Sequence, residues 1–407
     1  MAAAEGWTEA FRMRYGRSPT HAVRAPGRVN LIGEHIDYHG LPVMPFAIDR
    51  AVTVLLAPSL AGSGAGRVRI ANSASDLVGD DFRLFEPIVP LGGGDWRNYP
   101  RAAAKALAEH ESSEMICTRG VDALVASDLP TGAGLSSSSA LVVGVGLALA
   151  HVNGLETDRM AFAARMARAE RFVGTEGGGM DQAACMLSRD RHVSLLSFEP
   201  LSVEYLRFPE ELSVLVADSG DVAEKSGSVR VAYNERRASG ASALVAVAAA
   251  VGYAGASFAE LLTAFDAREL LEAAAGVLAG NFGDDVGEGR GLRRFRHVVT
   301  EARRVANARE ALVNGDAERL GALLTASHAS LRDDYEVSTP SLDELVEVAL
   351  HAGALGARLT GAGFGGAAIA LVNAADEEAV RAALEVVAGA DAVMSARPSG
   401  GATVRAL

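Results

Sequence analysis

The 407-residue sequence is poor in cysteine and has no surplus of basic residues. Its two cysteines, Cys117 and Cys185, cannot build a disulfide framework or a cysteine zinc cluster, so we expect reduced thiols. Asp and Glu number 51 against 38 Lys and Arg, which gives a formal net charge of −13. Because nucleic acids and acidic membranes attract basic surfaces, this balance disfavours both as partners. A nucleotide ligand stays compatible, since backbone dipoles, a few arginines and Mg²⁺ can hold a small phosphate group.

Long apolar runs are also missing. The longest, residues 140–150, is too short to span a bilayer. The first residues lack the basic segment and apolar core of a secretory signal, so we expect a cytoplasmic protein. Hydrophobic residues at 49% and charged residues at 22% are typical of a globular chain. A chain of 407 residues exceeds the usual size of one hydrophobic core, which predicts two domains.

The hydrophobic pattern predicts helices mixed with strands, without a strict βαβ repeat, and therefore an α+β fold. Helices are expected at residues 7–16, 96–110 and 158–172, from residue 181, through most of 226–354, and at 376–388. Strands are expected at residues 21–32, 43–57, 67–71, 120–126, 192–198, 213–217, 367–372 and 402–407. Pro200 and Pro209 interrupt regular structure, so we expect one domain at residues 1–205 and a second at residues 206–407.

Residues 130–140, PTGAGLSSSSA, place two glycines and four serines directly before the apolar run. We interpret them as a loop that enters a buried helix. The first N–H groups of a helix lack partners and carry partial positive charge, so they suit phosphate. Gly132 and Gly134 let the backbone close around an anion. The lysine of a Walker A loop is absent, and a plain turn with a serine N-cap is the alternative. Hydroxyls for phosphate oxygens or a metal come from Ser136, Ser137, Ser138 and Ser139.

The segment 27–40 carries five polar side chains within six residues: Glu34, His35, Asp37, Tyr38 and His39. Such a density of donors and acceptors suits a polyhydroxylated ligand, because each sugar hydroxyl both donates and accepts. A solvated polar loop is one alternative. A metal site at the two histidines is another, although the flanking glycines argue against the helix that a His-x3-His pair needs.

Two further segments are rich in glycine. Asp181 follows three glycines near an expected helix start, where a carboxylate either caps the helix or acts as a catalytic group. Glu170, near the end of the preceding helix, either reaches a divalent cation or is a surface charge beside Arg171. Residues 356–366 are expected to form a glycine-rich turn. They open no clear βαβ unit, which argues against a dinucleotide fingerprint.

Taken together, in this order and at these separations, the segments resemble the GHMP kinase superfamily and, within it, the galactokinase family. Residues 27–38 resemble the galactokinase signature, and residues 135–140 resemble the GHMP phosphate loop. Residues 178–182 resemble the catalytic segment of the family, and residues 359–366 its C-terminal glycine motif. The resemblance implies a two-domain GHMP kinase fold with mixed and antiparallel sheets, helices packed on them, and the active site in the cleft between the domains.

The resemblance also implies the reaction, transfer of the ATP γ-phosphate to the anomeric hydroxyl of galactose. Asp181 matches the catalytic carboxylate and Arg28 the arginine that faces the reaction centre. The residues that match the sugar ligands are Glu34, His35, Asp37, Gly178 and Tyr233. The implied ATP-binding residues are Gly132, Gly134, Ser136, Ser137, Ser138 and Ser139, and the implied Mg²⁺ ligands are Ser138 and Glu170. We expect a monomer whose partners are a small sugar and ATP.

Several residues depart from the usual pattern of the family. Ile36 and His39 stand where most galactokinases have Thr and Asn. Residues 174–181 and 35–38 are more similar to the N-acetylgalactosamine kinase and plant galactokinase branch. N-acetylgalactosamine, arabinose and galacturonate therefore stay open as alternative substrates. A non-catalytic sugar and ATP sensor is an alternative of another class, and the intact phosphate loop argues against it. The polar segment 27–40, named the sugar segment below, argues against mevalonate or homoserine as the substrate.

Overall fold

The computed structural model describes residues 2–60, 66–74, 76–108, 118–130, 132–221, 228–278 and 289–407. Helices and strands are mixed along this part of the chain, which confirms the α+β class. Cys117 lies outside the described residues, and Cys185 is a buried free thiol, as expected. Burial raises the pKa of the Cys185 thiol well above its ordinary value, so the group is inert at neutral pH.

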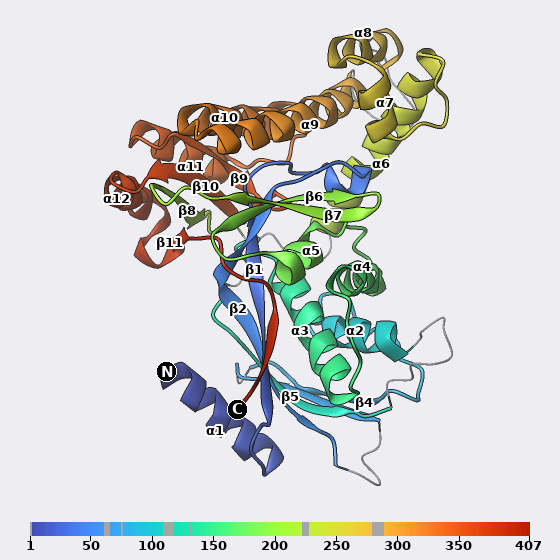
Figure 1. Ribbon diagram of the computed structural model, residues 1–407, viewed down its shortest axis with the longest axis vertical. Coiled ribbons are helices and arrows are strands. Elements are labelled where there is room, and N and C mark those ends of the chain that lie inside the picture. Colours follow the sequence, from blue (N-terminus) through green and yellow to red (C-terminus); the bar gives the residue numbers. More distant parts are fainter. Residues whose placement is uncertain are drawn as a thin grey trace.

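A six-stranded sheet with the order β12-β1-β2-β5-β3-β4 forms the lower half of the molecule (Figure 1). Its strands are β1 (His21–Asn30), β2 (Pro45–Pro58), β3 (Arg67–Asn72), β4 (Asp80–Arg83), β5 (Val121–Ser127) and β12 (Thr403–Ala406). Neighbouring strands are antiparallel, apart from the parallel pair β3 and β5. Because β12 pairs with β1, the last strand in the sequence lies in the same sheet as the first strand.

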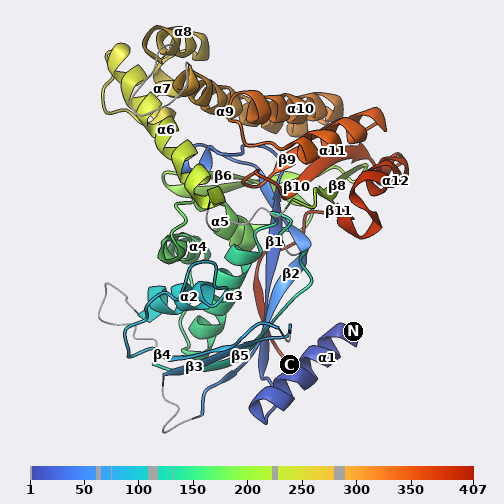
Figure 2. The same cartoon turned by 180° about the vertical axis from the view of Figure 1, so that it is seen from behind.

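Different helices cover the two faces of this sheet. Val54 belongs to the main hydrophobic core, whereas the next residue, Leu55, packs with Phe11 of α1 (Ala2–Tyr15). Successive strand side chains point to opposite faces, so α1 lies on one face and α3 (Ser137–Val152) on the other. Figure 2 shows α1 separated from α3 by the sheet.

Helix α3 is buried almost all round, which explains its continuous apolar sequence. It begins at Ser137, within the segment 130–140 that is named the serine loop below. The rest of the helix packs against β1 and β2. The helices α2 (Asn98–Ala108), α4 (Arg159–Ala169) and α5 (Met180–Leu187) pack beside it. The N-terminal ends of α3 and α5 therefore lie close to the serine loop and to Asp181.

The upper half contains a four-stranded antiparallel sheet with the order β11-β8-β10-β9 (Figure 1). Its strands are β8 (Leu212–Asp218), β9 (Gly356–Thr360), β10 (Ala367–Asn373) and β11 (Val393–Ala396). The helices that accompany it are α9 (Arg290–Asn314), α10 (Ala317–Asp333), α11 (Pro340–His351) and α12 (Glu377–Ala388), while α6 (Ser228–Ala250), α7 (Phe258–Ala264) and α8 (Ala267–Leu278) lie at one corner. The hairpin β6 (His192–Phe198) and β7 (Leu201–Arg207) lies between the two halves.

Some expected element boundaries are wrong. Helix α1 begins at Ala2 rather than at residue 7, because the alanines before Trp7 favour a helix without showing an amphipathic pattern. Residues 356–360, expected as part of a glycine-rich turn, form the fully buried strand β9. The short strands β4 and β11 and the second hairpin strand β7 were not expected. Their four to seven residues carry too little pattern to distinguish them from loops.

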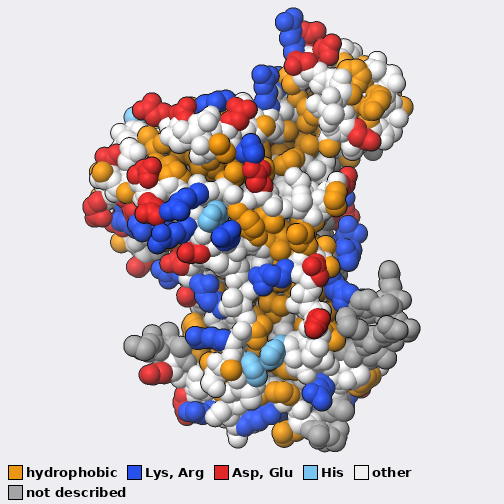
Figure 3. Space-filling model, in the orientation of Figure 1, with side chains coloured by type: hydrophobic (Ala, Val, Ile, Leu, Met, Phe, Trp, Pro, Cys, Tyr) orange, Lys and Arg blue, Asp and Glu red, His pale blue; other side chains and the backbone are white. Residues whose placement is uncertain are grey.

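Side chains of both charge signs lie on the visible face of the molecule (Figure 3). Figure 3 shows acidic and basic side chains interspersed over the visible face instead of gathered in one basic patch. Within the described ranges, every helix is too short or too polar to serve as a membrane span.

Candidate active site

The polar side chains of the sugar segment are buried. After β1 ends at Asn30, the chain turns and forms a short 3-10 helix, η1 (Asp37–His39). Glu34, His35 and Asp37 on this turn are 1%, 4% and 8% exposed. The alternative of a solvated polar loop is therefore wrong, because buried polar groups are retained only where they have partners or a ligand.

His35 is held as a neutral imidazole. Its Nε2 donates to the carbonyl of Ala362 over 3.0 Å, so its Nδ1 accepts from the hydroxyl of Tyr38 over 2.7 Å. Burial lowers the pKa of His35 to about 3, in agreement with this tautomer. With both ring nitrogens engaged, and with no group of three or more His, Cys, Asp or Glu suited to a metal in the described part of the chain, the metal alternative for His35 and His39 is wrong.

Arg28 and Asp181 meet as a buried ion pair. The Nε of Arg28 lies 2.7 Å from Oδ1 of Asp181, and the two side chains are 3% and 15% exposed. A second nitrogen of Arg28, Nη1, donates to the carbonyl of Gly134 over 2.8 Å. Arg28 therefore links the carboxylate to the serine loop. The N-cap of α5 is Gly179, so Asp181 is not the capping residue of this helix.

The carboxylate of Asp181 also has a hydroxyl partner. Ser139 Oγ donates to Oδ2 of Asp181 over 3.4 Å, and Gln182 Nε2 donates to Ser139 Oγ over 3.2 Å. Ser139 is fully buried. The structure thus places Ser139 behind Asp181, although it was expected among the ATP-binding serines.

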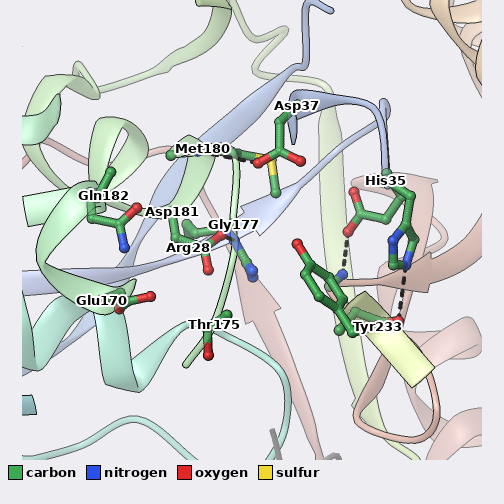
Figure 4. A pocket seen from close by; sticks show the side chains of 15 residues that line it. Arg28, His35, Asp37, Glu170, Thr175, Gly177, Met180, Asp181, Gln182 and Tyr233 are labelled. Atoms are coloured by element: carbon green, nitrogen blue, oxygen red, sulfur yellow. Dashed lines mark hydrogen bonds and ion pairs between the residues drawn. The ribbon is translucent and has the colours of Figure 1, made fainter. Parts of the chain in front are cut away.

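A pocket with about 540 Å³ of empty space, part of it open to solvent, brings most of the expected sugar-site residues together (Figure 4). Figure 4 shows Arg28 beside Asp181, with Asp37, His35 and Tyr233 around the same space. Seven expected residues line this cavity: Arg28, Glu34, His35, Asp37, Glu170, Asp181 and Tyr233.

Two carboxyl groups at this cavity have raised pKa values. Burial raises the pKa of Glu34 to about 7, although Arg358 and Arg28 oppose the shift. Burial, followed by the negative charge of Asp181, raises the pKa of Asp37 to about 6. Both groups therefore change protonation state near neutral pH. The ionised carboxylate only accepts hydrogen bonds, whereas the protonated form can also donate one.

Gly178 is required by the close approach of two backbones. A β-carbon at this position would lie 2.3 Å from the carbonyl carbon of Asp37 and 2.4 Å from the amide nitrogen of Tyr38. Real β-carbons do not come so close, so the loop before α5 can pack against η1 only with glycine here. Glycine at 178 thereby brings Asp181 next to the sugar segment.

A neighbouring pocket, with about 1210 Å³ of empty space that is partly open to solvent, is bordered by the serine loop. Its other walls include the rings of Trp96 and Tyr99 and apolar side chains of β2 and β5. Ser136 is the N-cap residue of α3, with a φ of 60°, but its side chain makes no capping hydrogen bond to the helix. The expected ATP-site residues that line this cavity are Gly132, Gly134, Ser136, Ser137 and Ser138.

The two expected metal ligands border different cavities. Ser138 lines the larger cavity, at the start of α3. Glu170, 7% exposed at the start of η2 (Glu170–Val173), lines the cavity of Asp181. The alternative of a surface charge at Glu170 is therefore wrong.

The loop between β9 and β10 separates the two cavities. Ala362 lines both of them, and Gly361 donates its N–H to the Glu34 carboxylate. Gly361 has a φ of 86°, and a β-carbon there would lie 2.9 Å from the carbonyl oxygen of Gly134. The glycine motif connects strands β9 and β10, and it also borders both cavities.

Four residues that line the two cavities or contact their lining were not predicted from the sequence: Trp96, Tyr99, Gln182 and Arg358. Trp96 and Tyr99 were read only as the start of a helix, and Gln182 only as a neighbour of Asp181. A signal was present for Arg358, because it is the one charged residue in the buried strand Gly356–Thr360.

Family models match three parts of the chain. The galactokinase galactose-binding signature matches residues 9–58, the GHMP kinase N-terminal domain matches residues 98–189, and the GHMP kinase C-terminal domain matches residues 308–388. These ranges contain β1 with the sugar segment, the serine loop with Asp181, and the glycine motif.

Similar proteins give the same assignment. A galactokinase of Chloroflexus aurantiacus is 39% identical over 378 residues, 92% of this chain and 90% of that protein. A galactokinase of Streptomyces coelicolor is 38% identical, over 97% of this chain and 96% of that protein. The Lactococcus lactis galactokinase structure with galactose has a TM-score of 0.82 at 29% identity, covering 98% of this chain and 99% of its own. A mevalonate kinase structure, at 19% identity and a TM-score of 0.59, shares the fold. The chain belongs to the galactokinase family of the GHMP kinases.

Proposed function

We propose that the protein phosphorylates the anomeric hydroxyl of D-galactose with ATP and releases galactose 1-phosphate and ADP. The observation that carries this proposal is the Arg28–Asp181 ion pair at a cavity shared with Glu34, His35 and Asp37. The carboxylate of Asp181 lies 2.7 Å from the guanidinium of Arg28, in a cavity lined by polar side chains that can bind sugar hydroxyls. Such a carboxylate can accept a proton from a sugar hydroxyl.

Asp181 accepts or orients the proton of the anomeric hydroxyl. Arg28 and Ser139 each take one position on the carboxylate, and its remaining lone pairs face the incoming hydroxyl. The permanent charge of Arg28 holds Asp181 ionised and stabilises negative charge that develops on the attacking oxygen. Because Arg28 also binds the carbonyl of Gly134, it fixes the distance between the base and the phosphate loop.

Glu34, Asp37, Tyr233 and the backbone at Gly178 hold the sugar. The two carboxylates accept hydrogen bonds from hydroxyl groups, and charged acceptors form the stronger bonds. The ring of Tyr233 lies 5.5 Å from that of His35, so it closes the cavity on the side of α6. His35 orients this wall through Tyr38 and Ala362.

ATP occupies the larger cavity. Gly132 and Gly134 adopt φ angles of 80° and 69°, which let the loop wrap the phosphates before the start of α3. The base packs against Trp96 and Tyr99, at the apolar end of the cavity. This arrangement directs the phosphates towards Asp181, on the other side of the Ala362 wall.

Ser138, at the start of α3, and Glu170, at the start of η2, would hold Mg²⁺. The fit rests on their chemistry, since a hydroxyl and a carboxylate are oxygen donors and Mg²⁺ prefers oxygen ligands with several waters. When bound, Mg²⁺ neutralises the charge of the transferring phosphoryl group. We also propose a monomer in the cytoplasm, with domains at residues 1–205 and 206–407, except that β12 (Thr403–Ala406) joins the sheet of the first domain.

ADP release with a panel of sugars tests this function. The panel contains galactose, N-acetylgalactosamine, arabinose and galacturonate, and Asp181→Asn is the matched control. We expect galactose to give the highest kcat/KM. If galactose gives the lowest value of the panel, the substrate is another sugar, and if no sugar releases ADP, the protein is a sensor.

A further inference from the structure

Arg358 is a buried charge without an assigned role. It lies on β9, its side chain is 0% exposed, and it is among the largest fully buried side chains of the described residues. A guanidinium taken out of water is costly unless it has an anionic partner and acceptors. The environment of Arg358 therefore shows what it stabilises.

The acceptors of Arg358 all belong to the sugar segment. Its Nη1 donates to the carbonyls of Asn30 and Leu31 over 3.1 and 3.0 Å. Its Nη2 lies 3.5 Å from Oε2 of Glu34, which is 2% exposed at its side chain. One guanidinium thus fixes the chain after β1 and also faces the carboxylate on that turn.

The second cation that acts on Glu34 is paired elsewhere. Arg28 favours the charged form of Glu34, but its Nε lies 2.7 Å from Oδ1 of Asp181. Arg358, by contrast, forms its ion pair with Glu34 itself.

The neighbouring histidines do not supply positive charge. They come from three elements packed around Glu34 and Arg358: His35 on the same turn, His297 on α9 and His328 on α10. Burial lowers their pKa values to about 3, 4 and 4, so all three are neutral near pH 7. Asp37 and Glu301 add negative charge, and this makes Arg358 more important for Glu34.

The two oxygens of Glu34 are oriented by its neighbours. The backbone N–H of Gly361 donates to Oε1, and Asn30 Nδ2 donates to Oε2, beside Arg358. Arg358 is the middle residue of β9 and Gly361 directly follows that strand, so one strand delivers both groups. Glu34 lines the cavity, so these contacts hold its carboxylate at the wall of that space.

We propose that Arg358 is a positioning residue for sugar binding: its buried guanidinium favours the ionised form of the Glu34 carboxylate and directs it into the sugar cavity. The inference rests on the proposed function, in which Glu34 binds sugar hydroxyls. Arg358 acts through Glu34 and the turn at residues 30–31, and it does not touch the sugar itself.

Galactose binding at several pH values tests this role. Titration calorimetry without nucleotide, from about pH 6 to about pH 9, compares the intact protein with Arg358→Lys and Arg358→Met. Arg309→Met, which removes an exposed arginine of α9 paired with Glu204, is the matched control. In Arg358→Met we expect the acidic midpoint of galactose binding to rise by about one pH unit or more, which weakens binding about fivefold or more near pH 7. Arg358→Lys keeps the charge, so its midpoint stays closer to that of the intact protein.

The proposal is overturned if folded Arg358→Met keeps the acidic midpoint of the intact protein, or if it loses affinity equally at every pH. If Arg358→Met does not fold, the double variant Arg358→Met, Glu34→Gln decides, because removing both charges avoids an unpaired buried carboxylate. Recovery of folding by the second change supports the pairing, and failure to recover contradicts it.

If the protein binds no galactose at any pH, the proposed function is contradicted. The pairing of Arg358 with Glu34 is then tested without sugar, by measuring the unfolding free energy against pH. Arg358→Met then loses unfolding free energy as the pH rises above about 7, because Glu34 must ionise without its cation. The double variant lacks this loss. Equal pH dependence of the two variants contradicts the role of Arg358.

Discussion

Arg28 and Asp181 are 153 positions apart in the chain, and the Nε of Arg28 lies 2.7 Å from Oδ1 of Asp181. Arg28 comes from β1, in the six-stranded sheet, and Asp181 from the first turn of α5. Their contact brings the sugar segment, the serine loop and the glycine-flanked aspartate to one place. The proposed chemistry depends on this convergence.

Replacing Asp181 separates catalysis from binding. We expect Asp181→Ala to lower kcat by about 10²- to 10⁴-fold, with a much smaller change in the KM for galactose, because the group accepts a proton in the transition state. Asp181→Asn keeps the shape and serves as the control. Steady-state ADP release measures both constants, and an equal loss in kcat and KM argues against a catalytic role.

Arg28 requires both its charge and its geometry. Arg28→Lys retains a positive charge but cannot reach Asp181 and the carbonyl of Gly134 together, so we expect an intermediate loss of kcat. Arg28→Met loses the charge as well, and its kcat falls by about 10²- to 10³-fold. Equal activity of the two variants contradicts a role for the charge.

Ser139 and Ser137 distinguish the two sides of the serine loop. Ser139→Ala removes the hydroxyl behind Asp181, and we expect kcat to fall about fivefold, the equivalent of about 1 kcal/mol, with the KM for ATP unchanged. Ser137→Ala alters the nucleotide cavity instead and raises the KM for ATP. A rise in the KM for ATP in Ser139→Ala assigns Ser139 to the phosphates.

Trp96 forms the aromatic wall of the nucleotide cavity. We expect Trp96→Ala to raise the KM for ATP about tenfold, because a stacked aromatic contact is lost, and to leave the KM for galactose unchanged. The second tryptophan, Trp7 of α1, packs in a separate cluster on the other face of the sheet. Trp7→Ala is thus the matched control for nucleotide titrations, and an equal effect of both variants contradicts the assignment.

The raised pKa of Glu34 has a measurable effect on stability. Its pKa is about 7 in the folded protein against an ordinary value of 4.5, so the folded state binds more protons between these values. The Glu34 contribution to stability is present below about pH 4.5 and is lost as the pH rises to about 7. His35 and His297, with lowered pKa values, act in the opposite direction below their ordinary pKa of 6.5.

The difference between the intact protein and Glu34→Gln isolates this contribution. We expect the unfolding free energy of the intact protein, relative to Glu34→Gln, to decrease from about pH 4.5 to about pH 7 and then to level off. Denaturant unfolding at a series of pH values measures it. A difference that stays constant over this range shows that Glu34 titrates normally.

Local sequence was sufficient for the elements that carry strong patterns. The apolar run after Ser139 predicted the buried helix α3, and the dense polar cluster at Glu34–His39 indicated a ligand site. Gly178 and Asp181 fell on the loop and helix start that the glycines indicated.

Long-range contacts were beyond the sequence pattern. The orientation of Ser139 towards Asp181 depends on the rotation of α3 against α5, because four consecutive serines offer hydroxyls in every direction. Arg358 reads as an interruption of an apolar strand until the backbone of Asn30 is placed beside it. The pairing of β12 with β1 joins the two ends of the chain, and no local signal reports it.

Identification of the phosphorylated product tests the central claim most directly. The protein is incubated with ATP, Mg²⁺ and galactose, and phosphorus NMR with mass spectrometry locates the transferred phosphate. We expect galactose 1-phosphate in equal amount to ADP, and about 10²-fold less or lower from Asp181→Asn. ADP without a sugar phosphate, phosphate on another hydroxyl, or undiminished product from Asp181→Asn would contradict the account.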